Sequence, residues 1–321
     1  LGSMCSRLLS LGVPVIRDRR VSLAGGIRRV SSMDAPFVGR ARGAVLGNLV
    51  GDAAAVPNHW VYDPAKMAAH VKASARGPAF CDPPGNGFYV TEVGGVSCYA
   101  DQTLCLLESL VASHGFDEND YASRLSTGFG RESAYEIDAV DSSNWPQLKK
   151  NPTDAEGKII EKERVWRLPV DGPWRHGSVK TFLANYVTHG LDAAKSGSND
   201  EQVDGCCKVP PLVALYAGDA SLLPTVERAV RVTQNTDKAV AYACGFARIL
   251  ESLVTGAAGT VAEACEQART ALSDPARICP NPLDVDVRHA LELTATLADV
   301  PRENVGAKLK ESLEMKGTSL S

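Results

Sequence analysis

Glycine occupies every fourth position from Gly39 to Gly51 in the stretch GRARGAVLGNLVGDAAAVPNHW, which runs from Gly39 to Trp60. Each glycine inside a helix costs about 1 kcal/mol relative to alanine, so four of them on one helical face need a physical reason. Because four residues are only slightly more than one helical turn, these glycines lie on nearly the same face of the helix. The lack of side chains on that face leaves a groove that another backbone can approach closely. A membrane-spanning helix is excluded by four charged or polar residues, Arg40, Arg42, Asn48 and Asp52. The stretch therefore predicts a central helix that is packed closely against its neighbours in a helical bundle.

The composition of the chain excludes several classes of protein. Its 321 residues are 44% hydrophobic, which is enough for a large core, and its net charge of −4 comes with no basic stripe. No apolar run approaches the ~20 residues of a membrane span. The nine cysteines include no C-x-x-C pair, so we expect them to be buried and reduced. We expect a monomer with neither a nucleic-acid nor a membrane partner.

The first 35 residues are set apart by their composition. Leu1 to Ser3, before Met4, resemble a tag scar, and the segment from Met4 to Met33 holds six arginines, five serines and one acidic residue. This composition is typical of an organelle transit peptide, which would direct the protein to the mitochondrion or another organelle. The alternative is an ordinary disordered basic tail on a cytoplasmic protein. Under either interpretation these residues are excluded from the fold.

Helical periodicity predominates in the rest of the chain. Asp63 before Pro64 predicts a helix start, and Asp101 is expected to cap a second helix, whose apolar residues lie on one face. The sequence predicts helices at 65–75, 101–111, 179–186, 222–233, 240–254, 260–272, 285–297 and 305–315. A strand is expected at 87–98, and loops at 78–87 and 141–157. We predict one all-α domain over 36–313, followed by a tail at 314–321.

Three motifs resemble those of a known family. R-x-R-G-A-V-L-G-N-L-V-G-D-A, from Arg40 to Ala53, resembles the first-helix signature of the ADP-ribosylglycohydrolases. Ala-Asp-Gln-Thr at 100–103 stands where that family carries Ser/Thr-Asp-Asp-Thr, and Thr-Gln-Asn-Thr-Asp at 233–237 resembles its Thr-His-x-Asp. The resemblance covers about 37–297 and implies that family's fold, a single-domain orthogonal helical bundle. The variant Gly-Pro-Trp-Arg-His-Gly-Ser at 172–178 looks like the branch that contains the J-type crystallins and selenoprotein J, some members of which are structural proteins.

The resemblance implies a hydrolase that uses two Mg²⁺ ions to break the glycosidic bond between ADP-ribose and a protein side chain. Its partner would be an ADP-ribose-like small molecule or an ADP-ribosylated protein. Asp101 would then be the catalytic residue, and Asp101, Gln102 and Thr103 would be the metal ligands. Mg²⁺ prefers carboxylate, hydroxyl and water oxygens, which is the chemistry of the family's cluster.

This sequence departs from the family pattern at several of these positions. Ala100 has no hydroxyl, Gln102 is neutral, and no acidic residue stands at 58–60. Asp284-Val285-Asp286 lacks the hydroxyl and the glycine turn of the family's later element, so N-capping explains Asp284 more simply. The family's C-terminal Gly-Gly-Asp segment is missing. Two hypotheses follow: a hydrolase with a weakened metal site and doubtful turnover, or a non-catalytic J-crystallin-like structural or ligand-binding protein.

The residues expected to bind the ligand fall in three places. Asp52 and His59 would line the pocket at the end of the glycine-rich helix, and Gly205 and Lys208 belong to DGCCK, which loosely resembles the family's glycine-rich pocket loop. Trp174, Arg175 and His176 form the third group. Tryptophan can stack on a base or sugar, and arginine beside a helix N-terminus can hold a phosphate. The alternative for this third group is a structural corner.

Overall fold

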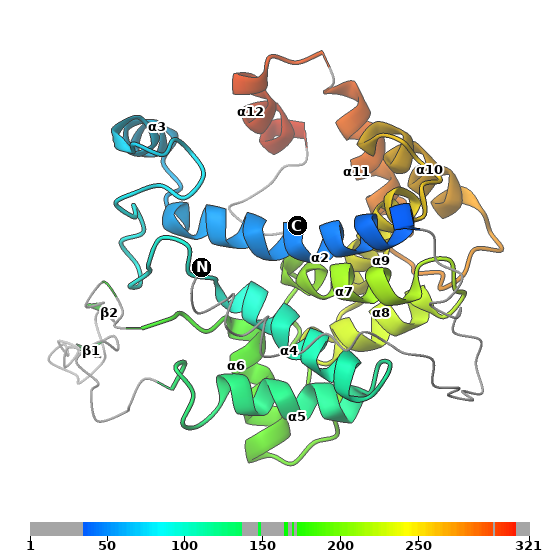
Figure 1. The fold of residues 1–321 in the computed structure, drawn as a ribbon, viewed down its shortest axis with the longest axis horizontal. Coiled ribbons are helices and arrows are strands. Elements are labelled where there is room, and N and C mark those ends of the chain that lie inside the picture. Colours follow the sequence, from blue (N-terminus) through cyan, green and yellow to red (C-terminus); the bar gives the residue numbers. More distant parts are fainter. Residues whose placement is uncertain are drawn as a thin grey trace, which may run out of the picture. The chain divides into compact units, whose positions relative to one another are not determined.

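The computed structural model describes residues 35–136, 147–148, 164–165, 169, 172–297 and 299–312. Figure 1 shows that helices account for nearly all of its regular structure. The predicted N-terminal segment before Ala35, most of the predicted loop at 141–157 and the predicted tail at 314–321 lie outside the described residues.

The described chain is all-α, as the sequence predicts. The two strands are β1 (Gln147–Leu148) and β2 (Arg164–Val165), which pair antiparallel. The helices are α2 (Ala35–Ala55), α3 (Pro64–Ala73), α4 (Cys98–Ala112), α5 (Glu118–Phe129), α6 (Gly177–Leu183), α7 (Val209–Tyr216), α8 (Leu222–Arg231), α9 (Asp237–Thr255), α10 (Val261–Ser273), α11 (Asp284–Thr296) and α12 (Arg302–Ser312). Short 3₁₀ turns are η2 (Val56–Asn58), η5 (Ala193–Lys195) and η6 (Val203–Lys208), and η4 (Ala184–Thr188) is a π turn.

The chain divides into two compact units that alternate along the sequence. Unit 1 contains the described residues of Val50–Asp101 and Thr127–His176. Unit 2 contains those of Leu11–Leu49, Gln102–Ser126 and Gly177–Ser321. Because neither unit is a continuous stretch of chain, composition along the sequence gives no boundary between them.

Helix α9 lies at the centre of unit 2 and contacts α7, α8, α10 and α11. The Thr236 hydroxyl accepts a hydrogen bond from Ala239 N and caps its start, and Gly256, with a φ of 79°, ends it in the left-handed conformation. The buried side chains of Ala241, Leu272 and Val287 join α9 to α10 and α11. Burial of such side chains stabilises the unit by roughly 1.5–3 kcal/mol for each large one.

The glycines of α2 do not serve the purpose that their spacing predicts. A Cβ atom added at Gly39, Gly43, Gly47 or Gly51 would meet no atom within 4 Å, and Leu46 on the same helix is 48% exposed. The predicted close approach of another backbone to this face is therefore wrong for the described residues. Periodicity identifies a helical face, but it does not identify what lies against that face.

The close approach of a neighbour occurs instead at Gly245 on α9. A Cβ atom there would lie 2.6 Å from Val287 Cγ1. Helix α2 is held at other points: Arg40 Nε donates to Val254 O at 2.7 Å, and Leu49 is fully buried. Its packing therefore depends on its large side chains rather than on its glycines.

Of three predicted helix caps, one is confirmed and two are wrong. The Asp63 carboxylate accepts hydrogen bonds from Ala65 N and Lys66 N, which confirms the predicted cap of α3. Asp101 does not cap α4, because that helix begins at Cys98 and the Ser97 hydroxyl accepts from Tyr99 N. The N-cap prediction for Asp284 is also wrong.

Asp284 is the first residue of α11 and makes no capping bond to that helix. Its carboxylate accepts from Arg277 Nε at 2.7 Å and from Asn281 N at 3.0 Å. Because the side chain is almost fully buried, the ion pair with Arg277 outweighs a helix cap.

The strand predicted at 87–98 is absent from the described structure. This segment is irregular apart from a single bridge residue, Tyr89, and it turns at Gly94, where φ is 87°. A positive φ breaks the extended conformation that a strand requires.

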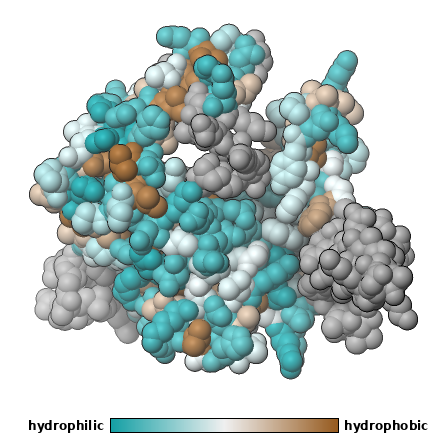
Figure 2. Space-filling model, turned by 180° about the vertical axis from the view of Figure 1, so that it is seen from behind, coloured by the Kyte–Doolittle hydropathy of each residue, from teal (hydrophilic) through white to brown (hydrophobic). Residues whose placement is uncertain are grey.

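The described residues on the side of the surface drawn in Figure 2 form no large apolar face. On the side drawn in Figure 2, hydrophobic residues form small separate patches among hydrophilic ones. Within the described residues, no helix combines the length and hydrophobicity that crossing a membrane requires.

Candidate functional site

The carboxylate of Asp52, in the last turn of α2, is held at both oxygens. Ser97 donates its backbone N–H to Oδ2 at 2.7 Å and its hydroxyl to Oδ1 at 2.5 Å. Burial raises the pKa of Asp52, and the two hydrogen bonds from Ser97 oppose that rise. Ser97 also caps α4, so one residue fixes both this carboxylate and the start of the next helix in unit 1.

His59 lies close enough to Asp52 for their charges to interact. Its Nδ1 shares a hydrogen bond of 3.0 Å with the Tyr89 hydroxyl. Burial lowers the pKa of His59, and the Asp52 carboxylate opposes this change. The pKa of Tyr89 is raised, mainly by burial, so its hydroxyl keeps its proton. A neutral imidazole beside a carboxylate is an arrangement that can accept a proton from water.

Asp101 is bound by a tyrosine. Tyr135 donates its hydroxyl to Asp101 Oδ2 at 2.6 Å. Burial and the Asp101 charge raise the pKa of Tyr135 far above its ordinary value, and the charge of Asp52 contributes in the same direction. Because both carboxylates act on one hydroxyl, unit 1 brings together Asp52, His59 and Asp101, three residues that the sequence predicts for one site.

An aromatic row extends through unit 1 from His59 to Phe88. Its neighbouring ring centroids are separated by 6.4 Å (His59–Tyr99), 5.6 Å (Tyr99–His176), 5.3 Å (His176–Trp174), 5.0 Å (Trp174–Trp60) and 4.4 Å (Trp60–Phe88). The sequence predicts a role for only three members, His59, Trp174 and His176. The other rings come from distant parts of the chain, and no spacing pattern connects them.

Trp60 is the strained member of the aromatic row. Its φ is 64°, a conformation that is rare for a bulky side chain, and 37% of its surface is exposed. It stacks on Phe88 with an interplanar angle of 15°. Backbone strain of roughly 1–3 kcal/mol that is retained beside exposed rings is typical of a binding site.

Arg175 has its partners within unit 1. Its Nη1 donates to Phe129 O at 2.5 Å and to Glu136 Oε2 at 3.3 Å. These bonds fasten the segment before α6 to the end of α5 and the residues after it. The predicted phosphate contact would have to compete with the Glu136 carboxylate for this guanidinium, so the geometry supports the structural-corner interpretation for this residue.

In unit 2, two of the predicted metal ligands are already paired. Lys208 Nζ donates to Gln102 Oε1 at 3.1 Å, and both side chains are fully buried. Thr103 Oγ1 donates to Cys207 O at 2.7 Å and accepts from Asn48 Nδ2 at 3.1 Å. The Lys208 ammonium group that is bonded to Gln102 would repel a divalent cation, and the Thr103 hydroxyl already has two partners. Gln102 and Thr103 therefore do not fit a Mg²⁺ ion.

Gly205 is required by packing. A Cβ atom at this position would lie 2.8 Å from Gln234 Oε1 and 3.1 Å from Val230 Cγ1. The residue is buried in η6, between Asp204 and the cysteine pair at 206–207. Its contacts explain glycine here without a ligand, and the predicted ligand role of Gly205 remains a prediction.

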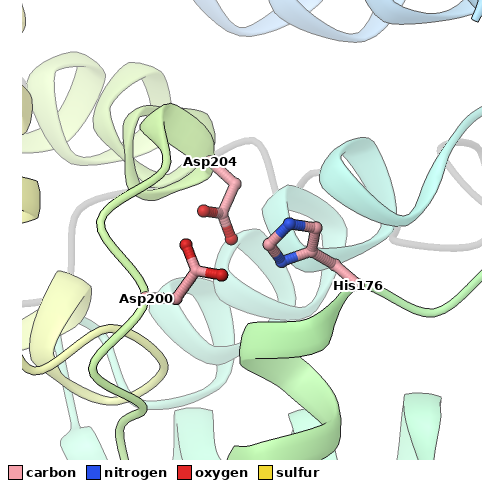
Figure 3. A group of neighbouring side chains, drawn as sticks. All are labelled: His176, Asp200 and Asp204. Carbon is pink, nitrogen blue, oxygen red and sulfur yellow. The ribbon is translucent and has the colours of Figure 1, made fainter. Parts of the chain in front are cut away.

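A pair of aspartates that the sequence analysis missed lies at the start of η6 and in the residues just before it, in unit 2. Figure 3 shows Asp200 and Asp204 with their carboxylates turned toward each other, and an oxygen of one lies within 4.8 Å of an oxygen of the other. Ser178 Oγ, in the first turn of α6, donates to Asp204 Oδ2 at 2.8 Å. The signal available in the sequence was the spacing of four residues between the two acids.

Figure 3 also draws His176, which the sequence analysis had noted. The boundary between the units falls at the His176–Gly177 peptide bond. The imidazole therefore belongs to the aromatic row of unit 1, where it contacts Tyr99 and Trp174, whereas the two carboxylates belong to unit 2.

Comparison with known proteins gives a family match and several similar proteins. Residues 33–319 match the family model for ADP-ribosylglycohydrolase. Crystallin J1A and crystallin J1B of Tripedalia cystophora are 33% and 32% identical to the chain over 215 residues, which is 67% of this chain and 58% of each crystallin. A solved structure titled "ADP-ribosylglycohydrolase-related protein complex" aligns with a TM-score of 0.48 at 20% identity and covers 89% of this chain and 83% of its own.

Proposed function

Because the chain belongs to the ADP-ribosylglycohydrolase family, we propose that it binds an ADP-ribosyl-type ligand through unit 1 and hydrolyses its glycosidic bond slowly. The observation that carries this proposal is the aromatic row beside the group formed by Asp52, His59 and Asp101. Flat rings suit a base or a sugar face, and the acids suit the ribose hydroxyls. The matched relatives extend beyond the 215 aligned residues, so their whole activity is not transferred here.

Each group in unit 1 has a distinct part in this proposal. Trp60 and Trp174 would stack on the ligand and exclude water from one side of the bond. His59, kept neutral by burial, would accept a proton from the attacking water, and Asp52 would stabilise the resulting imidazolium. Asp101, oriented by Tyr135, would accept a hydrogen bond from a ribose hydroxyl.

The slow turnover follows from the residues at 101–103. In the family resemblance these positions supply Mg²⁺ ligands, and Mg²⁺ would orient the ribose and the water. Here Gln102 accepts from an ammonium group and the hydroxyl of Thr103 is bonded on both sides. Asp101 alone keeps a carboxylate, and a single carboxylate with these neighbours does not fit the two-metal arrangement.

Calorimetric titration of the full chain with ADP-ribose tests the binding. We expect binding by the unaltered protein that is lost in Trp174→Ala and weakened about tenfold in Asp101→Asn, since each removes one direct contact. Tyr186→Ala, which removes a ring stacked on Phe182 in unit 2, is the matched control and should bind normally. Absence of binding by the unaltered protein would overturn the proposal.

A second candidate is a non-catalytic protein of the J-crystallin type. The observation in its favour is the 33% identity to crystallin J1A, combined with the poor fit of residues 102–103 to Mg²⁺. The two candidates differ in one assay: release of ADP-ribose from arginine- or serine-modified protein. Slow release that disappears in His59→Gln supports the hydrolase, whereas no release together with no heat of ADP-ribose binding supports the structural protein.

A further inference from the structure

We propose that unit 2 binds one divalent cation of the Mg²⁺ type through Asp200 and Asp204. These residues lie outside the 101–103 positions at which the family resemblance expects a metal. The proposal does not depend on the activity proposed above, because it concerns cation binding in the absence of any ADP-ribosyl ligand.

The first argument is the concentration of negative charge. Two carboxylates have oxygens within 4.8 Å of each other, and Asp204 is only 7% exposed. The hydrogen bonds to the Asp200 side chain come from neutral donors, the Gln202 backbone N–H and side-chain amide and the Gln234 amide. Two carboxylates at this separation repel each other, and a bound cation would remove that repulsion.

The second argument is a buried amide oxygen beside the pair. Gln234 is fully buried, and its Oε1 has no hydrogen-bond partner in the described part of the chain. Its Nε2 donates to Asp200 Oδ1 at 3.2 Å and to Gln202 O at 2.8 Å, so these acceptors fix which end of the amide is oxygen.

The amide oxygen of Gln234 points toward Gly205, because a Cβ atom at that glycine would lie 2.8 Å from it. Gly205 directly follows Asp204 in η6. A buried acceptor without a donor costs about 1–3 kcal/mol, and a cation or a water held by that cation would remove this cost. Two independent features of unit 2 therefore indicate the same kind of ligand.

The donor set selects the kind of cation. The groups that unit 2 offers are carboxylate, hydroxyl and amide oxygens, which favour hard cations. Ca²⁺ takes six to eight oxygen ligands, whereas Mg²⁺ is usually held by one or two carboxylates and keeps several waters. Two carboxylates with few further oxygens fit Mg²⁺, and Mn²⁺ is a suitable paramagnetic probe of the same site.

The test is calorimetric titration of the chelator-treated full chain with MgCl₂, with no nucleotide present. We expect one Mg²⁺ per chain, and we expect affinity to fall about tenfold or more in Asp200→Asn and in Asp204→Asn, because each removes a charged ligand. Glu201→Gln is the matched control: it removes one negative charge from the same loop, where Glu201 pairs with Lys238. That variant should bind Mg²⁺ as the unaltered protein does.

Circular dichroism shows which variants fold. Asp204→Asn risks misfolding because this side chain is buried, whereas Asp200 is half-buried and its variant decides the question if Asp204→Asn does not fold. The Mn²⁺ EPR signal of bound ion should likewise disappear in Asp200→Asn and persist in Asp101→Asn. The proposal is overturned if the unaltered chain binds no Mg²⁺, if Asp200→Asn binds as tightly, or if Asp101→Asn alone abolishes binding.

Discussion

The Tyr135 hydroxyl donates a hydrogen bond of 2.6 Å to Asp101, the only acidic residue among the three at 101–103. Tyr135 is 5% exposed, so the bond is formed in a largely dry part of unit 1. A hydrogen bond to a charged group at such a place contributes more than one at the surface. The orientation of Asp101 therefore depends on a tyrosine that stands 34 positions further along the chain.

Removing that hydroxyl should destabilise the fold. We expect Tyr135→Phe to lower the free energy of unfolding by about 1.5–3 kcal/mol, measured by urea denaturation. Tyr62→Phe is the control, since Tyr62 is 64% exposed and should lose less than about 0.5 kcal/mol. Equal losses in the two variants would show that the bond to Asp101 contributes nothing.

The lowered pKa of His59 predicts how stability depends on pH. Below the ordinary His pKa of 6.5, the unfolded chain binds a proton at this residue more readily than the folded chain does. Stability should therefore decrease as the pH falls from 6.5 through the folded pKa of His59. Urea denaturation at a series of pH values should show this decrease in the unaltered protein and a smaller one in His59→Gln.

The exposed His189 supplies the control for this pH effect, because His189→Gln should keep the full decrease. Asp52 acts with the opposite sign. Its pKa is raised, so its contribution is present below 3.8 and is lost as the pH rises through the folded pKa. If His59→Gln retains the decrease below pH 6.5, burial of this imidazole is not its cause.

Local signals predicted most of the fold. The apolar periodicity indicated α8, α9, α10 and α11 to within a few residues, and Asp63-Pro64 indicated the start of α3. Helix α7 was missed because Pro210 and Pro211 suggest a loop, although both stand in the first turn, where proline is tolerated. Helix α5 was missed as well, although its buried residues Tyr121 and Leu125 are spaced by four.

The candidate site was harder to predict because its contacts join distant parts of the chain. Lys208 and Gln102 are 106 positions apart, and no pattern in the sequence signals their hydrogen bond. The family resemblance selected Gln102 as a metal ligand from its position alone. What decides its chemistry is the ammonium group that faces it, and that information exists only in three dimensions.

This buried pair makes its own prediction. Lys208→Met should destabilise unit 2 by about 1–3 kcal/mol, because the Gln102 oxygen would remain buried without its donor. Adding Gln102→Leu should recover most of this loss, since replacing both polar partners removes the unpaired oxygen. The free energies of unfolding of the two single variants and the double variant form the cycle that checks this. Additive losses would contradict a direct bond.

The glycines of α2 give a prediction with the opposite sign. Because a Cβ atom at Gly43 or Gly47 meets nothing within 4 Å, alanine there should raise the free energy of unfolding by about 0.5–1 kcal/mol. Gly245→Ala is the contrasting variant, since its Cβ would lie 2.6 Å from Val287 Cγ1 and should destabilise the fold. Destabilisation by Gly47→Ala would restore the interpretation that another backbone packs against this face.

The strain at Trp60 can be separated from the stacking of its ring by two substitutions. Both Trp60→Gly and Trp60→Ala remove the ring that stacks on Phe88 at 4.4 Å, so both lose that contact. Only glycine adopts a φ of 64° without a steric cost, which for alanine is about 1–2 kcal/mol.

We therefore expect Trp60→Gly to be the more stable of the two by about 1 kcal/mol in urea denaturation. The same pair at Tyr62, which has no positive φ, should favour alanine, because glycine increases the entropy of the unfolded chain. If alanine is also favoured at position 60, the backbone there is unstrained. The aromatic row would then lack the strain that distinguishes a binding site from ordinary packing.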